Sequence, residues 1–208
     1  MLAHRGILFL NDLGKFSREA LEALRQPLEE GRVTIVRARH AVELPCRFML
    51  VAASNPCPCG RGEDSGECEC QPASMRRYRA KLSGALADRI DIAIAVERPS
   101  AEEMGAAPTS DSASVRDRVL AARERQERRL GPGRCNAEMG LAELRSSSGM
   151  DDEAKAMLAS GHARLRLSGR GHDRVLRLSR TIADLEGSDP VSGDHVARAL
   201  TLRRRGPD

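Results

Sequence analysis

Two short apolar runs mark the first half of the chain, GILFL at residues 6–10 and FMLVAA at residues 48–53. Neither run alternates with polar residues, which is typical of strands buried on both faces of a parallel sheet. A third strand is predicted over residues 91–98, after the basic helical segment SMRRYRAKL at residues 74–82. Strands separated by helical segments predict an α/β sheet.

A helix is predicted between the first two runs. Ser17 is a suitable N-cap and Gly31 a suitable stop. Because the residue before a proline disfavours the helical conformation, Pro27 predicts that the regular part of this helix ends near Gln26.

Two strand patterns, at residues 33–36 and 41–44, predict a β-hairpin. Its turn is basic and contains Arg37, Arg39 and His40. A basic turn of this kind is either a solvated loop tip or a contact for a polyanion.

The second half has a different pattern. Residues 100–114 are small and polar, and predict a linker between an α/β domain at residues 1–99 and an all-α domain at residues 115–208. Four helical patterns follow the linker, at VRDRVLAARERQERRL, DDEAKAMLASG, GHDRVLRLSRTIADLEG and SGDHVARALTLRR.

Composition narrows the class of protein. Hydrophobic residues make up 40% of the 208 residues, whereas aromatic residues make up 2%, so the core must be aliphatic. A formal charge of +4 is too small to indicate a nucleic-acid partner by itself.

No apolar stretch is long enough to span a membrane and no signal-peptide pattern opens the chain, so a cytoplasmic location without a membrane partner is expected. Six cysteines in such a chain suggest metal ligands or free thiols before disulfides.

Polar residues follow the apolar runs where open α/β sheets bind ligands. Asn11 and Asp12 follow the first run, and Asn55 follows the second. Nucleotide hydrolases use strand-end carboxylates for Mg²⁺ and for the attacking water. Arg89, before the predicted third strand, is a candidate arginine finger that reaches across a subunit boundary. Taken alone, the first run with its two polar residues is better explained by a core strand that enters a polar loop.

The ordered set of segments resembles the magnesium-chelatase-like AAA+ family, in particular the ComM-type competence and branch-migration helicases. The resemblance rests on HRGILFLNDLGKFSREALEALRQPLEEGRVTIVRARHAVELPCRFMLVAASNPCPCG, YRAKLSGALADRID and LSGRGHDRVLRLSRTIADL. It implies a partial AAA+ P-loop NTPase domain, with a parallel sheet, helices and an inserted hairpin, followed by an all-α helical lid. It also implies a hexameric ring, of identical or different subunits, driven by ATP and Mg²⁺.

The resemblance assigns roles to particular residues. It implies a Walker B strand at residues 7–12, a sensor-1 residue at Asn55 and an arginine finger at Arg89. Arg170, with Arg174 as the second choice, is similar to the ATP-sensing arginine of the lid.

The resemblance also bears on the hairpin and the cysteines. In related helicases the hairpin enters the ring channel, so Arg37, Arg39 and His40 are expected to hold the phosphates of single-stranded or branched DNA without reading its sequence.

Cysteines similar to those of the loop NPCPCGRGEDSGECECQP occur in the family and favour a structural Zn²⁺ site, although the spacing is C-x-C rather than C-x₂-C. A loop of reduced thiols is the alternative. The four candidate ligands are Cys57, Cys59, Cys68 and Cys70.

Two departures from the family pattern predict little or no ATP hydrolysis by this chain alone. The P-loop pattern G-x-x-x-x-G-K-[ST] does not occur in its 208 residues. The family has Asp then Glu where this chain has Asn11 and Asp12. An amide is a weaker Mg²⁺ ligand than a carboxylate, and a misplacement of roughly 1 Å can cost about a hundredfold in rate.

Three hypotheses remain open from the sequence. The favoured one is the carboxy-terminal part of an ATP-driven DNA motor of natural transformation and recombination, separated from an expected upstream P-loop segment. The second is a non-hydrolysing ring subunit that contributes Arg89 to a competent partner. The third is a zinc-stabilised nucleic-acid-binding module. A magnesium-chelatase subunit is a further enzyme alternative, which the cysteine loop and SRTIADL disfavour.

Overall fold

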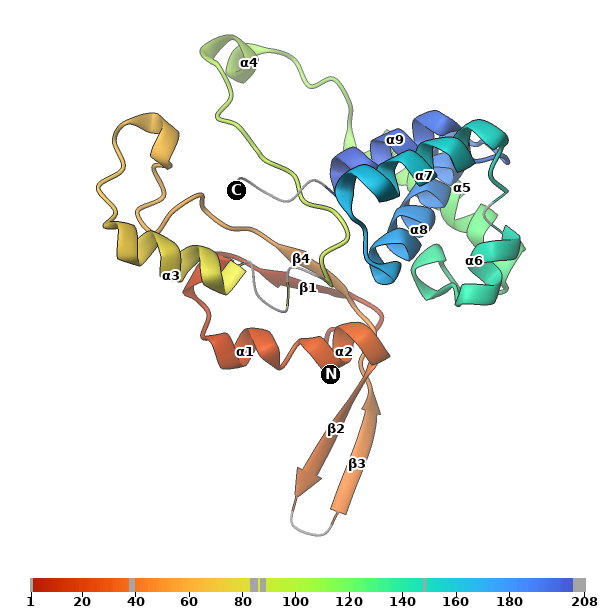
Figure 1. The fold of residues 1–208 in the computed structure, drawn as a ribbon, viewed down its shortest axis with the longest axis horizontal. Coiled ribbons are helices and arrows are strands. Elements are labelled where there is room, and N and C mark those ends of the chain that lie inside the picture. Colours follow the sequence, from red (N-terminus) through yellow and green to blue (C-terminus); the bar gives the residue numbers. More distant parts are fainter. Residues whose placement is uncertain (1, 38–39, 83–85, 87–88, 148, 204–208) are drawn as a thin grey trace. The chain divides into compact units, whose positions relative to one another are not determined.

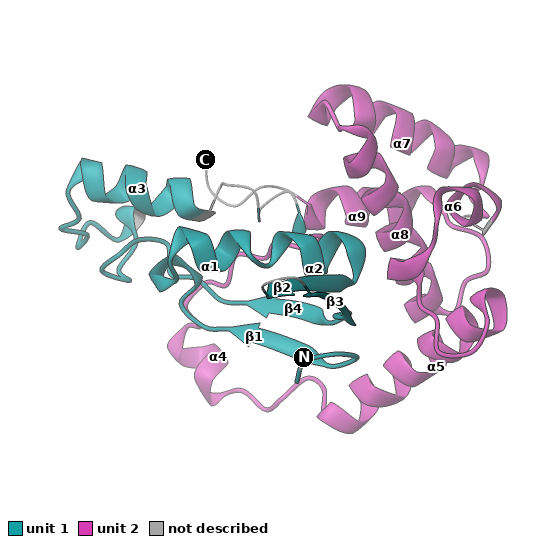
Figure 2. Cartoon of the chain, turned by 90° about the horizontal axis from the view of Figure 1, so that it is seen from below, with its two compact units in different colours: residues 1–90 teal, residues 91–208 magenta. Residues whose placement is uncertain are grey.

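The computed structural model describes the chain except for residues 1, 38–39, 83–85, 87–88, 148 and 204–208. Two compact units divide the chain, Met1–Ile90 and Asp91–Asp208 (Figure 2). Unit 1 and unit 2 are therefore considered separately.

A parallel pair of strands lies at the centre of unit 1. β1 (Ile7–Leu10) and β4 (Met49–Ala52) pair in parallel, as the two apolar runs predicted. The ladder continues past the strand ends, because the Ala53 N–H donates to the Leu10 carbonyl at 2.9 Å and the Leu13 N–H donates to the Ala53 carbonyl at 2.9 Å. The polar residues that follow β1 and β4 are thereby held at the same edge of the pair.

The helix predicted between these strands is broken in two, α1 (Arg18–Glu22) and α2 (Arg25–Glu30). Ser17 caps α1 and Gly31, with φ of 67°, ends α2, as predicted. The prediction that Pro27 ends the regular helix is wrong. Pro27 is the third residue of α2, where a missing N–H costs nothing because the first N–H groups of a helix have no partner within it.

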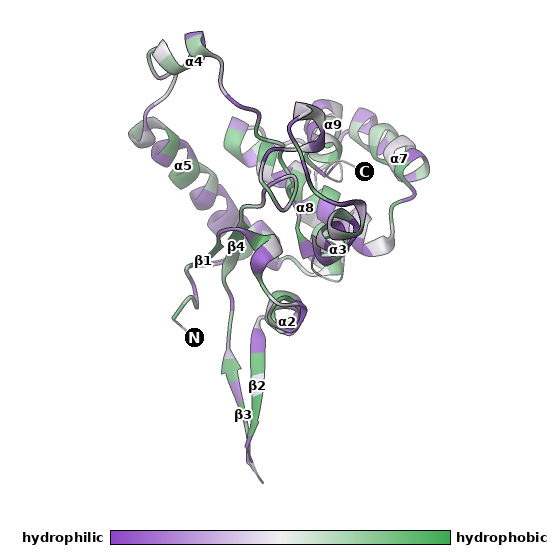
Figure 3. Ribbon diagram, turned by 90° about the vertical axis from the view of Figure 1, so that its left-hand side faces the viewer, coloured by the Kyte–Doolittle hydropathy of each residue, from purple (hydrophilic) through white to green (hydrophobic). Residues whose placement is uncertain are grey.

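The predicted hairpin is confirmed as β2 (Arg32–Arg37) and β3 (His40–Pro45), paired antiparallel with Arg37 opposite His40. It extends away from the helices and parallel strands of unit 1 (Figure 1; Figure 3). Valine and isoleucine alternate with polar residues along it, yet Ile35 is 47% exposed and Val42 51% exposed. The hairpin is therefore a solvent-facing arm.

The predicted basic helix is confirmed as α3 (Pro72–Leu82). The strand predicted over residues 91–98 is wrong, since this segment is extended but joins no sheet of the described residues. Its Ala93 N–H instead donates to the Leu202 carbonyl at 2.9 Å. An apolar run forms a strand only where a neighbouring strand accepts its backbone hydrogen bonds.

Unit 2 is helical among the residues described. Its helices are α4 (Ala101–Gly105), α5 (Ser112–Leu130), α6 (Leu141–Ser147), α7 (Asp152–Leu165), α8 (Gly169–Glu186) and α9 (Gly193–Leu202). The four patterns expected after the linker became α5, α7, α8 and α9. The segment predicted as a linker carries the short α4, capped by Ser100 and Glu103, and α5 already begins at Ser112.

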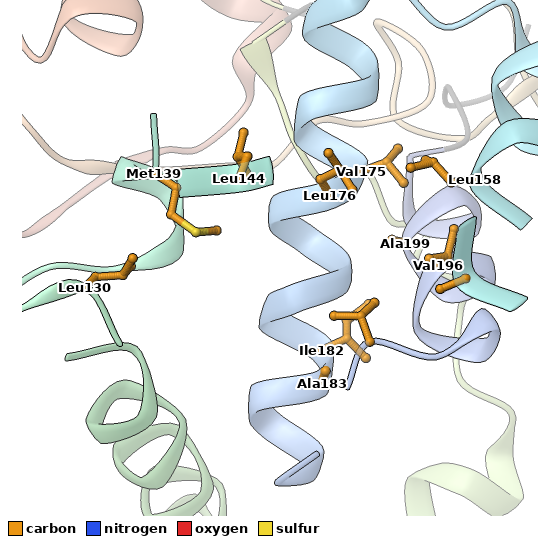
Figure 4. Packing of buried hydrophobic residues seen from close by; sticks show 12 residues of the cluster. Leu130, Met139, Leu144, Leu158, Val175, Leu176, Ile182, Ala183, Val196 and Ala199 are labelled. Carbon is orange, nitrogen blue, oxygen red and sulfur yellow. The ribbon is translucent and has the colours of Figure 1, made fainter. Parts of the chain in front are cut away.

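The core of unit 2 surrounds α8 (Figure 4). Val175, Leu144 and Val196 are at most 1% exposed, so α6, α8 and α9 share one apolar interior. Beside it, the buried Asp184 carboxylate accepts hydrogen bonds from Arg129, at 2.7 and 3.1 Å, and from Arg180, at 3.1 Å. The Arg129–Asp184 ion pair links α5 to α8, and separating its partners would leave a buried charge uncompensated.

No helix among the residues described is long and apolar enough to cross a membrane.

Candidate nucleotide-facing site and cysteine cluster

The residues that follow β1 and β4 meet at one edge of the parallel pair. The Asn55 side-chain amide donates to Asp12 Oδ1 at 3.1 Å, across 43 positions of sequence. The Lys15 ammonium lies 2.8 Å from the other carboxylate oxygen, Asp12 Oδ2. The structure thus brings together two residues predicted to act together, and adds a cation that the sequence analysis did not assign.

Asp12 is held in an uncommon backbone conformation, with φ of 55° and ψ of 53°. This left-handed region is tolerated by aspartate better than by most residues with a side chain. It turns the chain from β1 into the short 3-10 helix Leu13–Lys15. The hydrogen bond with Asp12 and the charge of its carboxylate raise the pKa of Lys15 above its ordinary value, so Lys15 stays charged and neutralises part of Asp12.

Asn11 precedes this turn and is exposed. The contact from Asn55 goes to Asp12 rather than to Asn11. The only carboxylate of the predicted Walker B pair is therefore the one that meets Asn55, and Asn11 can offer a cation only an amide oxygen.

Arg89 is placed within unit 1. Its side chain is 7% exposed and forms an ion pair with Glu29 of α2. A role across a subunit boundary would therefore require this ion pair to open. The sequence analysis had no signal for Glu29 as the partner of Arg89.

The two candidate ATP-sensing arginines both lie in the first turns of α8 in unit 2. Arg170 is exposed. Arg174 is 16% exposed and its Nε lies 3.2 Å from Asp91 Oδ1. Of the two candidates, Arg170 therefore has the side chain more open to an anion.

Of the three residues predicted to contact DNA, the structure describes two, and both lie at the end of the hairpin. Arg37 and His40 pair across β2 and β3, and both are exposed. Arg39 lies outside the described residues. Both of these side chains at the end of the arm are thus open to solvent.

The four candidate metal ligands form one cluster. All four sulfur atoms, of Cys57, Cys59, Cys68 and Cys70, lie within 4.8 Å of one another. Cys68 Sγ lies 3.7 Å from Cys57 Sγ and 3.7 Å from Cys59 Sγ, and the last two are 3.2 Å apart. Four sulfurs about 2.3 Å from a tetrahedral Zn²⁺ are about 3.8 Å from each other, so the observed spacing fits this ion closely.

The loop that carries the cysteines is shaped for close approach of the sulfurs. Gly60 and Gly62 have φ of 83° and 85°, in the left-handed region that glycine enters without steric cost. The Gly62 N–H donates to Cys57 Sγ at 3.2 Å, and Cys57 is 1% exposed. A backbone N–H aimed at a ligand sulfur is a feature of metal sites built from thiolates.

The thiols of the cluster differ in acidity. Burial opposes ionisation of Cys57, but hydrogen bonds from Gly62, Cys59 and Cys68 outweigh it and lower the pKa of Cys57 to about 6. A backbone hydrogen bond from Cys70 favours the Cys68 thiolate, yet burial and the neighbouring thiols prevail and raise the pKa of Cys68 to about 12. Cys57, the most buried of the four, is thus the thiol that these hydrogen bonds most favour as a thiolate.

Two functional neighbours were missed by the sequence analysis. Lys15 lies three residues after Asp12, a spacing that allows contact on a helical turn. Tyr78 of α3 donates its hydroxyl to the Asn55 carbonyl at 2.8 Å. Tyr78 is the only tyrosine of the chain, and this was the one feature of the sequence that marked it.

Paired parallel strands with polar residues at one edge, an inserted hairpin and a separate helical unit define a partial AAA+ domain with its helical lid. Comparison with known families agrees. Residues 1–104 match the family described as magnesium chelatase, subunit ChlI, and residues 109–203 match the description magnesium chelatase, subunit ChlI C-terminal. The chain belongs to this magnesium-chelatase-like family.

Similar proteins include bacterial relatives over nearly the whole chain. An uncharacterised protein of Mycobacterium tuberculosis is 42% identical over 206 residues, which is 98% of this chain and 41% of that protein. The competence protein ComM of Haemophilus influenzae is 39% identical over 206 residues, 97% of this chain and 40% of ComM. The uncharacterised protein YifB of Escherichia coli is 37% identical over 204 residues, 97% of this chain and 40% of YifB. The chain thus spans about two-fifths of the length of these relatives.

Proposed function

We propose that this chain is the carboxy-terminal part of a ComM-type AAA+ ATPase that moves DNA branches during transformation or recombination, and that it does not hydrolyse ATP by itself. The observation that carries the proposal is the contact of Asn55 with Asp12 at the ends of adjacent parallel strands. Family membership supports ATP and Mg²⁺ as the ligands of this edge. A cytoplasmic location and a place in a hexameric ring are parts of the same proposal.

The chemistry of the edge supports inactivity in isolation. A hydrolysing site needs a carboxylate for Mg²⁺, a second group to orient water, and a cradle for the phosphates. Here Asp12 is the one carboxylate, it is shared with Lys15, and no P-loop pattern occurs in the 208 residues. Asp12 and Asn55 are therefore assigned to contact with a nucleotide that other chain segments hold.

Phosphate release from ATP tests this assignment. The chain alone is expected to release no phosphate above a protein-free blank. Mixed with a family ATPase that has an intact P-loop, it is expected to change the turnover of that ATPase. Arg89→Ala should remove the change if Arg89 acts across the boundary, and Arg18→Ala, at an exposed arginine of α1, is the matched control. Turnover by the chain alone would refute inactivity, and an unchanged effect of Arg89→Ala would refute its role in trans.

The hairpin is assigned to DNA, because Arg37 and His40 are exposed at the end of an arm that extends from unit 1. Phosphate contacts of this kind depend on salt, with about one unit of slope lost for each contact removed. Arg37→Ala should weaken binding of single-stranded and branched DNA equally and reduce the salt slope by about 1, measured by fluorescence anisotropy. Arg25→Ala, which removes an arginine paired with Glu22, should leave the slope unchanged. A slope unaffected by Arg37→Ala would remove the hairpin from the interface.

The cysteine cluster is assigned to a structural Zn²⁺ ion. Four thiolates complete a tetrahedral coordination sphere and leave no position for water, so the ion would cross-link the loop rather than catalyse a reaction. Elemental analysis of the purified chain should find one zinc per chain. Cys59→Ser with Cys68→Ser should abolish it, whereas Cys46→Ser with Cys135→Ser should retain it, because these two cysteines lie outside the cluster. A chain purified under reducing conditions that binds no zinc would contradict the assignment.

A further inference from the structure

In the sequence, the cysteine cluster lies between Asn55, which follows β4, and the start of α3. Cys57 comes two residues after Asn55, and Cys70 comes two residues before α3 begins at Pro72. Contact among the four sulfurs closes this loop, so the start of α3 is brought back beside the end of β4. A metal ion in the cluster would make that closure a chemical cross-link.

α3 returns to the strand end through Tyr78. The Tyr78 hydroxyl donates to the Asn55 carbonyl at 2.8 Å and lies 2.9 Å from Ser54 Oγ. Both partners are in the short segment between β4 and the cysteine loop. One aromatic side chain of α3 therefore holds the backbone on which the Asn55 amide is mounted.

The same helix also contacts the segment that follows Asp12. A Cβ atom built on Gly14 would come within 2.1 Å of the Tyr78 ring, so the ring lies directly against the Gly14 backbone. Lys81 Nζ lies 3.4 Å from the Gly14 carbonyl oxygen and 3.5 Å from that of Phe16. Tyr78 thus contacts both loops that supply the Asn55–Asp12 pair.

A further contact ties α3 to the interior of the cysteine loop, where Arg79 pairs with Glu63. Among the described side chains of α3, Met75 is buried, whereas Arg76, Arg77 and Arg79 are exposed. The loop from Cys57 to Cys70, closed by its sulfurs and by the Arg79–Glu63 pair, therefore helps to place α3 and with it Tyr78.

We propose that Tyr78 is a positioning residue that couples the four-cysteine cluster to the Asn55–Asp12 pair. Metal binding in the cluster fixes α3, α3 places the Tyr78 hydroxyl on the Asn55 carbonyl, and the Asn55 amide is thereby held toward Asp12. This inference rests on the proposed function, since it deepens the roles given there to the cluster and to the strand-end pair. It makes metal occupancy a control on the nucleotide-facing edge.

The composition of the chain provides a direct probe. With one tyrosine and no tryptophan, the intrinsic fluorescence of the whole chain comes from Tyr78. A second probe is the side-chain NH₂ signal of Asn55 in a ¹⁵N correlation spectrum, assigned by its loss in Asn55→Asp. Both probes report structure at the site without any need for ATP hydrolysis.

The experiment adds zinc ions to the metal-free chain in the presence of a non-thiol reductant. In the native chain, zinc should change the Tyr78 emission and shift the Asn55 NH₂ signal. Cys59→Ser with Cys68→Ser should lose both responses, and Cys46→Ser with Cys135→Ser should keep both. Tyr78→Phe should still bind one zinc per chain but lose the shift of the Asn55 signal.

The outcomes separate the two levels of inference. If the native chain binds no zinc, the assigned metal site is wrong and the coupling falls with it. If zinc binds and the Asn55 signal does not shift, the metal site stands and the coupling is refuted. If zinc shifts the Asn55 signal as strongly in Tyr78→Phe as in the native chain, the coupling does not pass through the Tyr78 hydroxyl.

Discussion

Unit 1 and unit 2 bury their apolar side chains to very different extents. The described part of unit 2 has a continuous core around α8, with Val175, Leu144 and Val196 almost fully enclosed. Among the described residues of unit 1, the core cluster consists of Leu13, Leu21 and Leu86. On its strands, Phe9 is 60% exposed and Ile7 is 59% exposed.

The difference follows from the elements of each unit. A helix satisfies its own backbone hydrogen bonds and needs only one apolar face covered, which neighbouring helices can provide. β1 and β4 form a two-stranded sheet whose outward side chains Ile7, Phe9, Met49 and Val51 are exposed. A two-stranded sheet is marginally stable by itself, so we expect unit 1 to depend more on links such as the cysteine cluster than unit 2 does.

The largest expected effect is the loss of the buried ion pair in unit 2. Asp184→Ala leaves Arg180, which is 2% exposed, without its carboxylate partner, and should lower the free energy of unfolding by about 3–5 kcal/mol. Urea denaturation followed by far-UV circular dichroism measures this change. Asp152→Ala removes a carboxylate that is 98% exposed and paired with Lys155, and should change stability far less. Equal effects of the two variants would show that the Asp184 network does not support the core.

The second largest effect is the difference in stability between truncating an apolar side chain in unit 2 and truncating one in unit 1. Leu144→Ala creates a cavity in a filled interior and should cost about 2–5 kcal/mol of unfolding free energy. Phe9→Ala removes a ring that is already mostly in water, and should cost much less. The same denaturation experiment compares them. A cost of Phe9→Ala as large as that of Leu144→Ala would mean that the face of β1 is covered in solution.

Removal of the proposed Zn²⁺ ion should affect unit 1 alone. A ligand that binds only the folded state at 100 times its dissociation constant stabilises that state by about 2.7 kcal/mol. A chelator should therefore lower the unfolding midpoint reported by Tyr78 fluorescence, and leave the midpoint reported by the helices of unit 2 in place. The double serine variant at Cys59 and Cys68 should show no response to the chelator. A joint shift of both midpoints would mean that the units unfold together.

The smallest expected effect concerns the half-buried ion pair of Arg134 and Glu143 in unit 2. The hydrogen bond from Arg134, helped by the Gly140 N–H, lowers the pKa of Glu143 to about 2. Because the folded-state pKa lies below the ordinary value of 4.5, the stabilisation is complete above pH 4.5 and is lost as the pH falls toward 2. The native chain should be slightly more stable than Glu143→Gln at pH 7, and the two should converge near pH 2 in thermal unfolding. A difference that persists at pH 2 would assign it to packing instead of charge.

Much of the fold could be predicted because its signals are local. Ser17 begins a helix and Gly31 ends one where predicted, and the hairpin matches its strand pattern. The extended segment at residues 91–98 was predicted wrongly, since a strand is defined by a partner that a local pattern does not contain. The helix break before α2 was missed for a similar reason, because Pro27 is as compatible with a first turn as with an end.

The sequence by itself determined which residues are candidates for the chemistry. It placed polar residues after two strands, gathered four cysteines in one loop, and put arginines at the end of a hairpin. The tertiary structure alone decided how they are connected. Asn55 meets Asp12, Arg89 meets Glu29, and Tyr78 reaches Asn55 over 23 positions. Composition and spacing act over a few residues, whereas these contacts arise only when distant segments pack together, and that packing joins the cysteine loop to the strand ends.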